Sequence, residues 1–198
     1  NGVSNDFFPI KSMTLNEQSF MDNLKIESNF LLYVGSRTNY KNFDFVAKMM
    51  SKINNFKLIV VGGGDFSSNE IKIFSKNKIE SKIIKISSVT NSELNVLYNK
   101  AYAFVYPSSY EGFGIPIIEA MRAGCPVVAF DNEVNSEITE NKALLLKSLR
   151  DEEFLEKIQQ LSNQDFRDEL IENGFELALK YSWDKCCKET NEFYESLY

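Results

Sequence analysis

Two carboxylates lie close together in one stretch of this chain, residues 106–122, whose sequence is YPSSYEGFGIPIIEAMR. Glu111 follows a short apolar run that ends at Pro107, and Glu119 lies among Ile, Ala and Met residues. A carboxylate in so apolar a segment costs free energy unless something donates hydrogen bonds to it. Glu119 is therefore either held by Arg122 or the backbone, or kept for a hydroxyl-rich ligand.

The loop between these carboxylates has the composition of a ligand-binding turn. Gly112 and Gly114 allow the backbone to approach a ligand closely or to turn with positive φ. Pro116 suits the first turn of a helix, where its missing N–H costs nothing. The free N–H groups of that turn favour an anion. A simple helix cap is the alternative to a site for a phosphorylated ligand.

Two cations lie earlier in the chain, in the loop that follows an apolar run. Arg37 and Lys41 belong to the sequence GSRTNYKN, and a diphosphate bound without a metal ion needs such cationic partners. Two solvated loop charges are the alternative. The run Gly62–Gly64 matches a dinucleotide-binding fingerprint poorly, because Ser67 stands where the third glycine would be. A tight turn before a helix explains these glycines equally well.

Hydrophobic periodicity predicts an alternation of strands and helices. Continuous apolar runs such as FLLYV and FKLIVV are typical of strands buried on both faces. Residues 11–28 are polar and are expected to be an irregular loop with a weak helical turn, and Asn91 or Ser92 is expected to cap a helix. Strands are expected over residues 30–34, 56–61, 82–86, 101–106, 126–130 and 143–146, and helices over 43–53, 69–76, 92–101, 115–123, 152–161, 166–181 and 183–198.

This alternation predicts an α/β fold, a Rossmann-like doubly wound parallel sheet of about six strands with helices at the C-terminal end. Ligands of such sheets bind beyond the carboxyl ends of the strands, near a switch in strand order. The polar segments that follow the strands are residues 35–41, 62–64, 87–89 and 107–114. One rim of the sheet is therefore expected to carry the ligand-binding groups.

The composition is that of an ordinary globular domain, with 198 residues of which 43% are hydrophobic and 25% charged. A formal net charge of −6 disfavours nucleic acid as a partner. The chain has no His, and its 3 Cys form no disulfide framework, which suits a reducing cytosol. The acidic run 131–133 lacks further converging oxygens, so no metal site is expected. No apolar run approaches the roughly 18–20 residues of a membrane span.

The spacing of the two carboxylates points to a known family. Glu111 and Glu119 are separated by seven residues in EGFGIPIIE, which resembles the E-x7-E motif of retaining GT4 glycosyltransferases with the two-domain GT-B fold. The following run EAMRAGCPVVAF is similar to the same family. GSRTNYKNFD resembles the loop that binds the donor diphosphate there, and NGVSNDFFPI resembles the segment that joins the two domains.

This resemblance implies that the chain is the C-terminal, donor-binding half of a larger enzyme. Residues 1–28 would be an interdomain segment, residues 29–181 the nucleotide-sugar-binding domain, and residues 182–198 a C-terminal helix packing toward the absent N-terminal domain. The implied reaction is retaining, metal-independent transfer of a hexosyl unit from a nucleotide-diphospho-sugar donor to a saccharide or lipid-linked acceptor. No cofactor is expected.

The resemblance also implies a setting. Bacterial surface-polysaccharide assembly is expected, in the cytoplasm or at the inner face of the membrane, with any peripheral membrane association made through the missing domain. The isolated half is expected to bind donor weakly and to transfer little sugar.

The resemblance assigns roles to individual residues. Glu111 contacts the donor sugar and the charge that develops at its anomeric carbon, while Arg37 and Lys41 stabilise the departing diphosphate. Glu119 accepts hydrogen bonds from the two ribose hydroxyls, which suits its two oxygens. Segment 132–137 departs from the Gly-rich loop and Pro-Glu pair that the family has here. Only Glu137 of that pair is present, so no role is given to it. The other expected donor-binding residues are Gly35, Ser36, Gly63, Ser87, Val89, Gly112, Phe113, Gly114 and Ile115.

Two other functions stay open at the level of sequence. One is a nucleotide-sugar epimerase of GT-B fold, and the other is a non-catalytic nucleotide-binding or interaction module. An NAD-dependent dehydrogenase is disfavoured by the missing third glycine.

Overall fold

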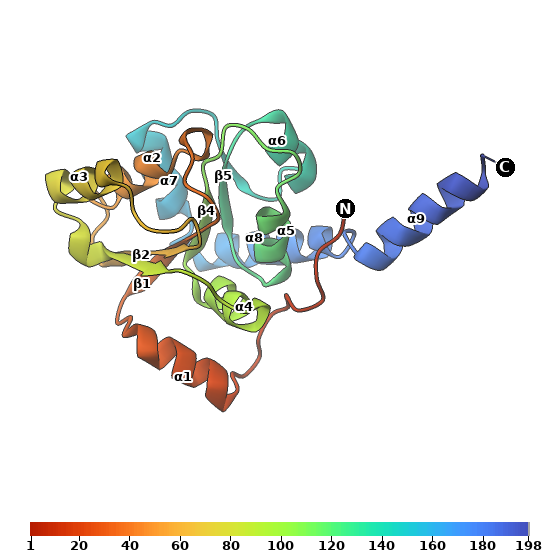
Figure 1. Ribbon diagram of the computed structural model, residues 1–198, viewed down its shortest axis with the longest axis horizontal. Helices are drawn as coiled ribbons and strands as arrows, with labels where there is room; N and C mark the ends of the chain where they lie inside the picture. The colour runs from red at the N-terminus through yellow and green to blue at the C-terminus, as the bar shows by residue number, and fades with distance from the viewer. Residues whose placement is uncertain (198) are drawn as a thin grey trace.

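The computed structural model describes residues 1–197, and these contain one sheet of six strands in the order β3-β2-β1-β4-β5-β6 (Figure 1). All neighbouring strands run parallel. The predicted parallel sheet of six strands is therefore confirmed. The strands are β1 (Asn29–Val34), β2 (Phe56–Val61), β3 (Ile83–Ile86), β4 (Ala103–Tyr106), β5 (Val127–Phe130) and β6 (Leu144–Leu146).

Helices cover both faces of this sheet. Leu32 and Phe104 pack in one core cluster with α4, α5 and α8, whereas Leu31 and Val105 pack in a second cluster with α2, α3 and α7. Successive strand residues point to opposite faces, so both faces are buried and the sheet is doubly wound, as predicted. The helices are α1 (Leu15–Leu24), α2 (Phe43–Met49), α3 (Ser68–Asn77), α4 (Asn91–Lys100), α5 (Ile115–Arg122), α6 (Glu133–Thr139), α7 (Asp151–Gln160), α8 (Gln164–Ala178) and α9 (Trp183–Glu195).

The order of the strands reverses between β1 and β4. From β1 the chain adds β2 and β3 on one side, and then returns to add β4, β5 and β6 on the other. The loops that follow β1 and β4 therefore lie beside each other at the carboxyl edge of the sheet. This is the switch point at which open parallel sheets bind ligands.

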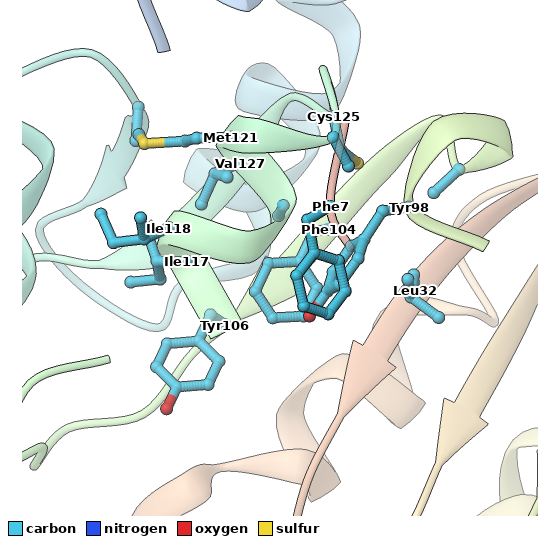
Figure 2. Packing of buried hydrophobic residues seen from close by; sticks show 14 of the residues in the cluster. Phe7, Leu32, Tyr98, Phe104, Tyr106, Ile117, Ile118, Met121, Cys125 and Val127 are labelled. Carbon is cyan, nitrogen blue, oxygen red and sulfur yellow. The ribbon is translucent and has the colours of Figure 1, made fainter. Parts of the chain in front are cut away.

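An aromatic and aliphatic cluster supports the end of β4 and holds α5 against the sheet (Figure 2). The Tyr98 ring, which is buried, packs edge-on against Phe7 and Phe104 with ring centroids 5.9 and 5.3 Å away. Ile117 and Met121 bury one side of α5 in the same cluster. This packing sets the position of α5, and with it the position of Glu119.

Helix starts differ from the prediction where a capping box is present. The range 11–28, expected to be irregular, contains α1, which begins at a box formed by Thr14 and Glu17. The cap of α4 is Thr90, which pairs with Glu93 in the same way. The expected caps Asn91 and Ser92 lie inside that helix instead. The reason is that a capping Thr three residues before a Glu satisfies two backbone N–H groups at once.

Two further helix boundaries correct the prediction. Helix α2 ends at Met49 and not at residue 53, because the N–H groups of Ser51 and Lys52 donate to carbonyls three residues earlier instead of four, at 3.1 and 2.9 Å. Helix α6, which was not predicted, begins at Asn132, whose side chain accepts a hydrogen bond from the Asn135 N–H. The sequence of α6, EVNSEIT, is mostly polar and has too little hydrophobic periodicity to predict a helix.

Helix α9 extends away from the sheet in Figure 1. A bridge between Val3 and Ser182 joins the start of the chain to the start of this helix, and Trp183 and Phe193 are exposed on it. The helix predicted over residues 183–198 and the segment predicted over 182–198 both end at Tyr198, which lies outside the described residues. No helix within residues 1–197 is long and apolar enough to cross a membrane.

Candidate functional site

The loops after β1 and β4 are tied to each other at the switch point. The Ser109 N–H donates to the Tyr40 carbonyl at 2.8 Å, and the Asn42 side chain donates to the Pro107 carbonyl at 2.9 Å. The loop that carries Lys41 and the loop that carries Glu111 therefore form one structural unit.

Lys41 and Glu111 meet within this unit. Lys41 Nζ lies 2.5 Å from Glu111 Oε1 and 3.3 Å from the Tyr106 hydroxyl, and the two charged side chains are 15% and 11% exposed. Burial, reinforced by Glu111, raises the pKa of Tyr106, so its hydroxyl stays neutral. The sequence assigned the cation and the carboxylate to the same reaction, and the structure brings their side chains into contact.

Glu119 lies on α5, partly exposed, with one hydrogen bond. The Tyr98 hydroxyl donates to Glu119 Oε2 at 3.2 Å. Burial raises the pKa of Glu119, and the hydrogen bond from Tyr98 offsets part of that rise. Arg122, considered above as a partner for Glu119, donates to Asn5 Oδ1 at 3.0 Å instead. Within residues 1–197, Glu119 makes no ion pair.

Arg37 lies on the β2 side of the switch point and contacts protein atoms with most of its donors. Its Nε donates to Glu70 Oε1 at 2.6 Å, and its Nη atoms donate to the carbonyls of Gly62, Gly64 and Asp65. The side chain is 4% exposed. A contact between Arg37 and a diphosphate would exchange these bonds for phosphate oxygens, and it stays a prediction.

The first turn of α5 follows the loop after β4 at the carboxyl edge of the sheet. Its cap, Gly114, has a φ of 87° and makes no side-chain cap, and Pro116 lies in the first turn, as predicted. A Cβ at Gly114 would lie 2.9 Å from Ile138 Cδ1, so α6 approaches this turn closely. Pro116 has no N–H and the Ile117 N–H donates to the Gly114 carbonyl at 2.9 Å, so Ile115 supplies the N–H of this turn that is left for a ligand.

Asn135 is a residue of this region that the sequence did not single out. It is fully buried, its side chain donates to the Phe130 carbonyl at 2.9 Å, and its Oδ1 has no partner among the described residues. That oxygen lies 3.6 Å from the position of a Cβ on Gly114. No local signal marks it, because the close approach of α6 to the α5 cap is a tertiary feature.

The remaining predicted residues are spread along the carboxyl edge. Gly35 follows β1, and its N–H donates to the Val61 carbonyl at the end of β2 at 2.9 Å. Ser87 and Val89 follow β3, the edge strand, three strands from β4. The Phe113 ring packs edge-on against Tyr181, with centroids 5.7 Å apart, and lines a groove of 460 Å³ beside α9. The structure therefore places Phe113 toward the C-terminal helices, while Gly112, Gly114 and Ile115 stay at the switch point.

No group of three or more His, Cys, Asp or Glu side chains within residues 1–197 is placed to hold a metal ion. Cys125 is buried in the core cluster beneath α5. The titratable groups of the site are thus carboxylates, a lysine and tyrosines.

The doubly wound sheet and its polar loops define a Rossmann-like domain with a candidate ligand site at the switch point. The chain belongs to the family of glycosyl transferases group 1, whose model matches residues 16–177. The membership in a glycosyltransferase family that the E-x7-E motif predicted is thereby confirmed at the level of group 1.

Individual relatives agree with this membership. The O-antigen chain mannosyltransferase RfbU of Salmonella typhimurium is 35% identical over 133 residues, which are 66% of this chain and 37% of that protein. Sucrose-phosphate synthase from Thermosynechococcus elongatus shares the fold with a TM-score of 0.84 and 24% identity, over 99% of this chain and 51% of that chain. HepE from Anabaena, solved with UDP and glucose, shares it with a TM-score of 0.81 and 16% identity, over 96% and 55%.

This chain spans between 37% and 48% of the length of the first curated relatives that it matches. It corresponds to one part of those proteins.

Proposed function

We propose that this chain is the donor-binding domain of a retaining glycosyltransferase that transfers a hexosyl unit from a nucleotide-diphospho-sugar to a saccharide or lipid-linked acceptor. Family membership supports the reaction class. The name of RfbU, a mannosyltransferase of the O-antigen chain, favours surface-polysaccharide assembly, and the UDP bound to HepE favours a nucleotide donor.

The state of Glu119 carries this proposal. Its carboxylate is partly buried beside the switch point, receives one hydrogen bond from Tyr98, and has a raised pKa. A buried carboxylate without a cation costs free energy, and a ligand that donates hydrogen bonds recovers it. The cis-diol of a ribose supplies two such donors to one carboxylate.

Lys41 and Glu111 suit the chemistry of sugar transfer. As the bond between the anomeric carbon and the diphosphate lengthens, negative charge grows on the phosphate oxygens and positive charge grows on the sugar ring. Lys41, with the Ile115 N–H of the α5 turn, would stabilise the first, and Glu111 would stabilise the second. Their contact at 2.5 Å keeps the pair nearly neutral before the donor arrives.

The proposal includes a second domain that precedes this one and supplies the acceptor site. The chain spans 37% of RfbU, which leaves most of such a protein outside it. The exposed side of α9, with Trp183 and Phe193, would pack toward that domain. The reaction is proposed to need neither metal nor cofactor, and to take place in the cytoplasm or at the inner face of the membrane.

The test is a calorimetric titration of the chain with UDP, GDP and ADP. The Glu119→Ala variant should bind the preferred nucleotide about 10–100-fold more weakly, because hydrogen bonds to a charged group contribute roughly 1.5–3 kcal/mol. Glu172→Ala, an exposed position on α8, is the matched control and should bind like the unaltered chain. An unchanged affinity in Glu119→Ala would refute the ribose assignment.

A further inference from the structure

The guanidinium of Arg37 is the most completely satisfied charge at the carboxyl edge. Its five N–H groups donate four hydrogen bonds: one to Glu70, at 2.6 Å, and three to the carbonyls of Gly62, Gly64 and Asp65, at 2.9, 3.2 and 2.8 Å. A bidentate contact with a phosphate needs two N–H groups side by side. Such a contact would have to break bonds that this turn already makes.

Aromatic rings hold the guanidinium in the same place. Its Cζ lies 4.7 Å from the centroid of the Phe66 ring and 5.6 Å from that of Phe43. Phe66 in turn packs edge-on against Phe74 of α3. Cation–π contacts of this kind add to the cost of moving the side chain toward a ligand.

Glu70 is the partner that fixes Arg37, and no role for it follows from the motif. It is 7% exposed, its Oε1 accepts from Arg37, and its Oε2 accepts from the Ser67 N–H at 2.6 Å. Burial alone would raise the pKa of Glu70, but the hydrogen bonds from Ser67 and Arg37 outweigh burial and lower it. Glu70 therefore stays charged at neutral pH and joins the start of α3 to the loop after β1.

The backbone between β2 and α3 is shaped around this pair. Gly62, Gly63 and Gly64 have φ values of 82°, 73° and 72°, a left-handed run that other residues adopt only at a cost. A Cβ at Gly63 would lie 2.4 Å from Arg37 Nη1. The glycines let three carbonyls of the turn converge on one guanidinium.

The convergence of carbonyls has a consequence for the N–H groups of the same turn. In a trans peptide the C=O and the N–H of the next residue point in opposite directions. Since the carbonyls of Gly62, Gly64 and Asp65 face Arg37, the N–H groups of Gly63, Asp65 and Phe66 face away from it. Among residues 1–197, none of these three N–H groups has a hydrogen-bond acceptor.

We propose that Glu70 is a positioning residue for donor binding: through Arg37 it fixes the Gly62–Gly64 turn, so that backbone N–H groups of this turn, and not the guanidinium, meet acceptor atoms of the nucleotide. The inference rests on the proposed function. It makes Arg37 a positioning residue and leaves Lys41 as the cation that meets the diphosphate.

The first test follows the backbone of the turn by NMR in a ¹⁵N-labelled chain. Adding the nucleoside diphosphate that binds best should shift the Gly63 amide signal of the unaltered chain. In Glu70→Gln, which keeps the shape of the side chain but loses its charge, the Gly63 and Gly64 signals should move or broaden before any ligand is added. Glu17→Gln is the matched control, because Glu17 completes the capping box of α1 without an arginine partner. Unmoved glycine signals in Glu70→Gln would overturn the proposal.

The second test compares a nucleoside diphosphate with its nucleoside. Glu70→Gln and Arg37→Gln should each weaken the binding of both ligands by the same factor, about three- to tenfold, and the double variant should be no weaker than the worse single one, since the two residues act as a unit. Lys41→Gln should weaken the diphosphate selectively. Arg37→Gln that costs the diphosphate at least tenfold more than the nucleoside would show a direct phosphate contact and overturn the proposal.

The two proposals fail in different ways. If the unaltered chain binds none of UDP, GDP and ADP, or if Glu119→Ala and Lys41→Gln change nothing, the proposed function fails and this inference falls with it. If those variants behave as expected but Arg37→Gln is selective for the diphosphate, only the positioning role fails.

Discussion

Glu70 and Glu119 are two carboxylates that folding removes from most of the solvent, on opposite sides of the switch point. Glu70 receives hydrogen bonds from Arg37 and from the Ser67 N–H, and its pKa is lowered although burial acts to raise it. Glu119 receives one hydrogen bond, from Tyr98, and burial raises its pKa. The same functional group is thus stabilised as an anion at one position and destabilised as an anion at the other.

This difference distinguishes a charge used by the fold from a charge kept for a ligand. A buried ion whose donors are all protein atoms contributes to a defined backbone geometry. A partly buried ion without a cation costs stability, and it persists where binding recovers the cost. Glu70, with Arg37 as its partner, belongs to the first group and Glu119 to the second.

The largest effect is expected from removing Glu70 altogether. Glu70→Ala should lower the free energy of unfolding by about 3 kcal/mol or more, because it leaves the buried Arg37 without its carboxylate. Urea denaturation of both variants measures this, with Glu119→Ala as the comparison. A loss in Glu119→Ala as large as that in Glu70→Ala would remove the distinction between the two positions.

The next effect concerns the glycines around Arg37. Gly63→Ala places a Cβ 2.4 Å from Arg37 Nη1, whereas at Gly64 no atom lies within 4 Å of the same position. Both residues have positive φ, so each alanine carries a similar backbone cost of roughly 1–2 kcal/mol. Gly63→Ala should cost more than Gly64→Ala in urea denaturation. If the two variants lost the same free energy of unfolding, the Arg37 side chain would be free to move away from a Cβ at position 63, and its hydrogen bonds would not hold it in place.

Removing the charge of either carboxylate should change the melting temperature by a smaller amount, and the change should have opposite signs for Glu119→Gln and Glu70→Gln. Because the folded-state pKa of Glu119 is raised, its charge opposes folding above the unfolded pKa of about 4.3. Glu119→Gln should therefore raise the melting temperature at pH 7 by roughly 2–4 °C, the size of a change of about 1 kcal/mol in a chain of this length.

That gain should shrink as the pH falls through the raised folded-state pKa of Glu119 and vanish below the unfolded pKa, where the carboxyl is protonated in both states. For Glu70 the sign is reversed: its lowered pKa contributes stability that is present above the unfolded pKa and is lost as the pH falls through the folded pKa. Glu70→Gln should lower the melting temperature at pH 7, by an amount that shrinks in acid. Thermal melts between pH 4 and 8 would contradict the contrast if both variants shifted in the same direction.

The smallest effect is expected at Tyr98. Tyr98→Phe keeps the buried ring but removes the hydrogen bond to Glu119, so the pKa of Glu119 should rise further. Nucleotide binding needs the charged carboxylate. When the pH is lowered, the affinity of Tyr98→Phe should therefore begin to fall at a higher pH than that of the unaltered chain, while at pH 8 the two affinities should differ by no more than about threefold. Tyr102→Phe is the control, because the Tyr102 hydroxyl donates to the Ile158 carbonyl on the other face of the sheet. An unchanged pH profile in Tyr98→Phe would separate Tyr98 from the function of Glu119.

Much of the fold could be predicted because its signals are local. The run FLLYV and the alternation of apolar runs with amphipathic helices identify β1 and the doubly wound sheet directly. Helix α1 was missed because its sequence, LNEQSFMDNL, has no buried residue and little apolar periodicity, and its capping box is the clearest mark of its start. Helix α6 was missed because its sequence, EVNSEIT, is mostly polar and gives little apolar periodicity.

Less of the candidate site could be predicted than of the fold. The motif identified Glu111 and Glu119, and the loop sequence identified Arg37 and Lys41. Nothing local distinguishes Arg37 from Lys41, since both are loop cations next to polar and aromatic residues. Glu70 reads as an ordinary capping residue from its spacing to Ser67, and its second bond, to Arg37, is invisible in the sequence.

The amino-acid sequence by itself determined the strands, most helices and the family, because apolar runs, capping boxes and the E-x7-E spacing act over a few residues. The tertiary structure alone decided which charges meet. Lys41 pairs with Glu111, 70 positions away, because the reversal of strand order between β1 and β4 brings the loops after these strands to one edge. Arg37 pairs with Glu70, 33 positions away, because β1 and β2 are neighbours in the sheet. Whether a side chain's donors and acceptors are satisfied there depends on burial and geometry, which no local pattern encodes.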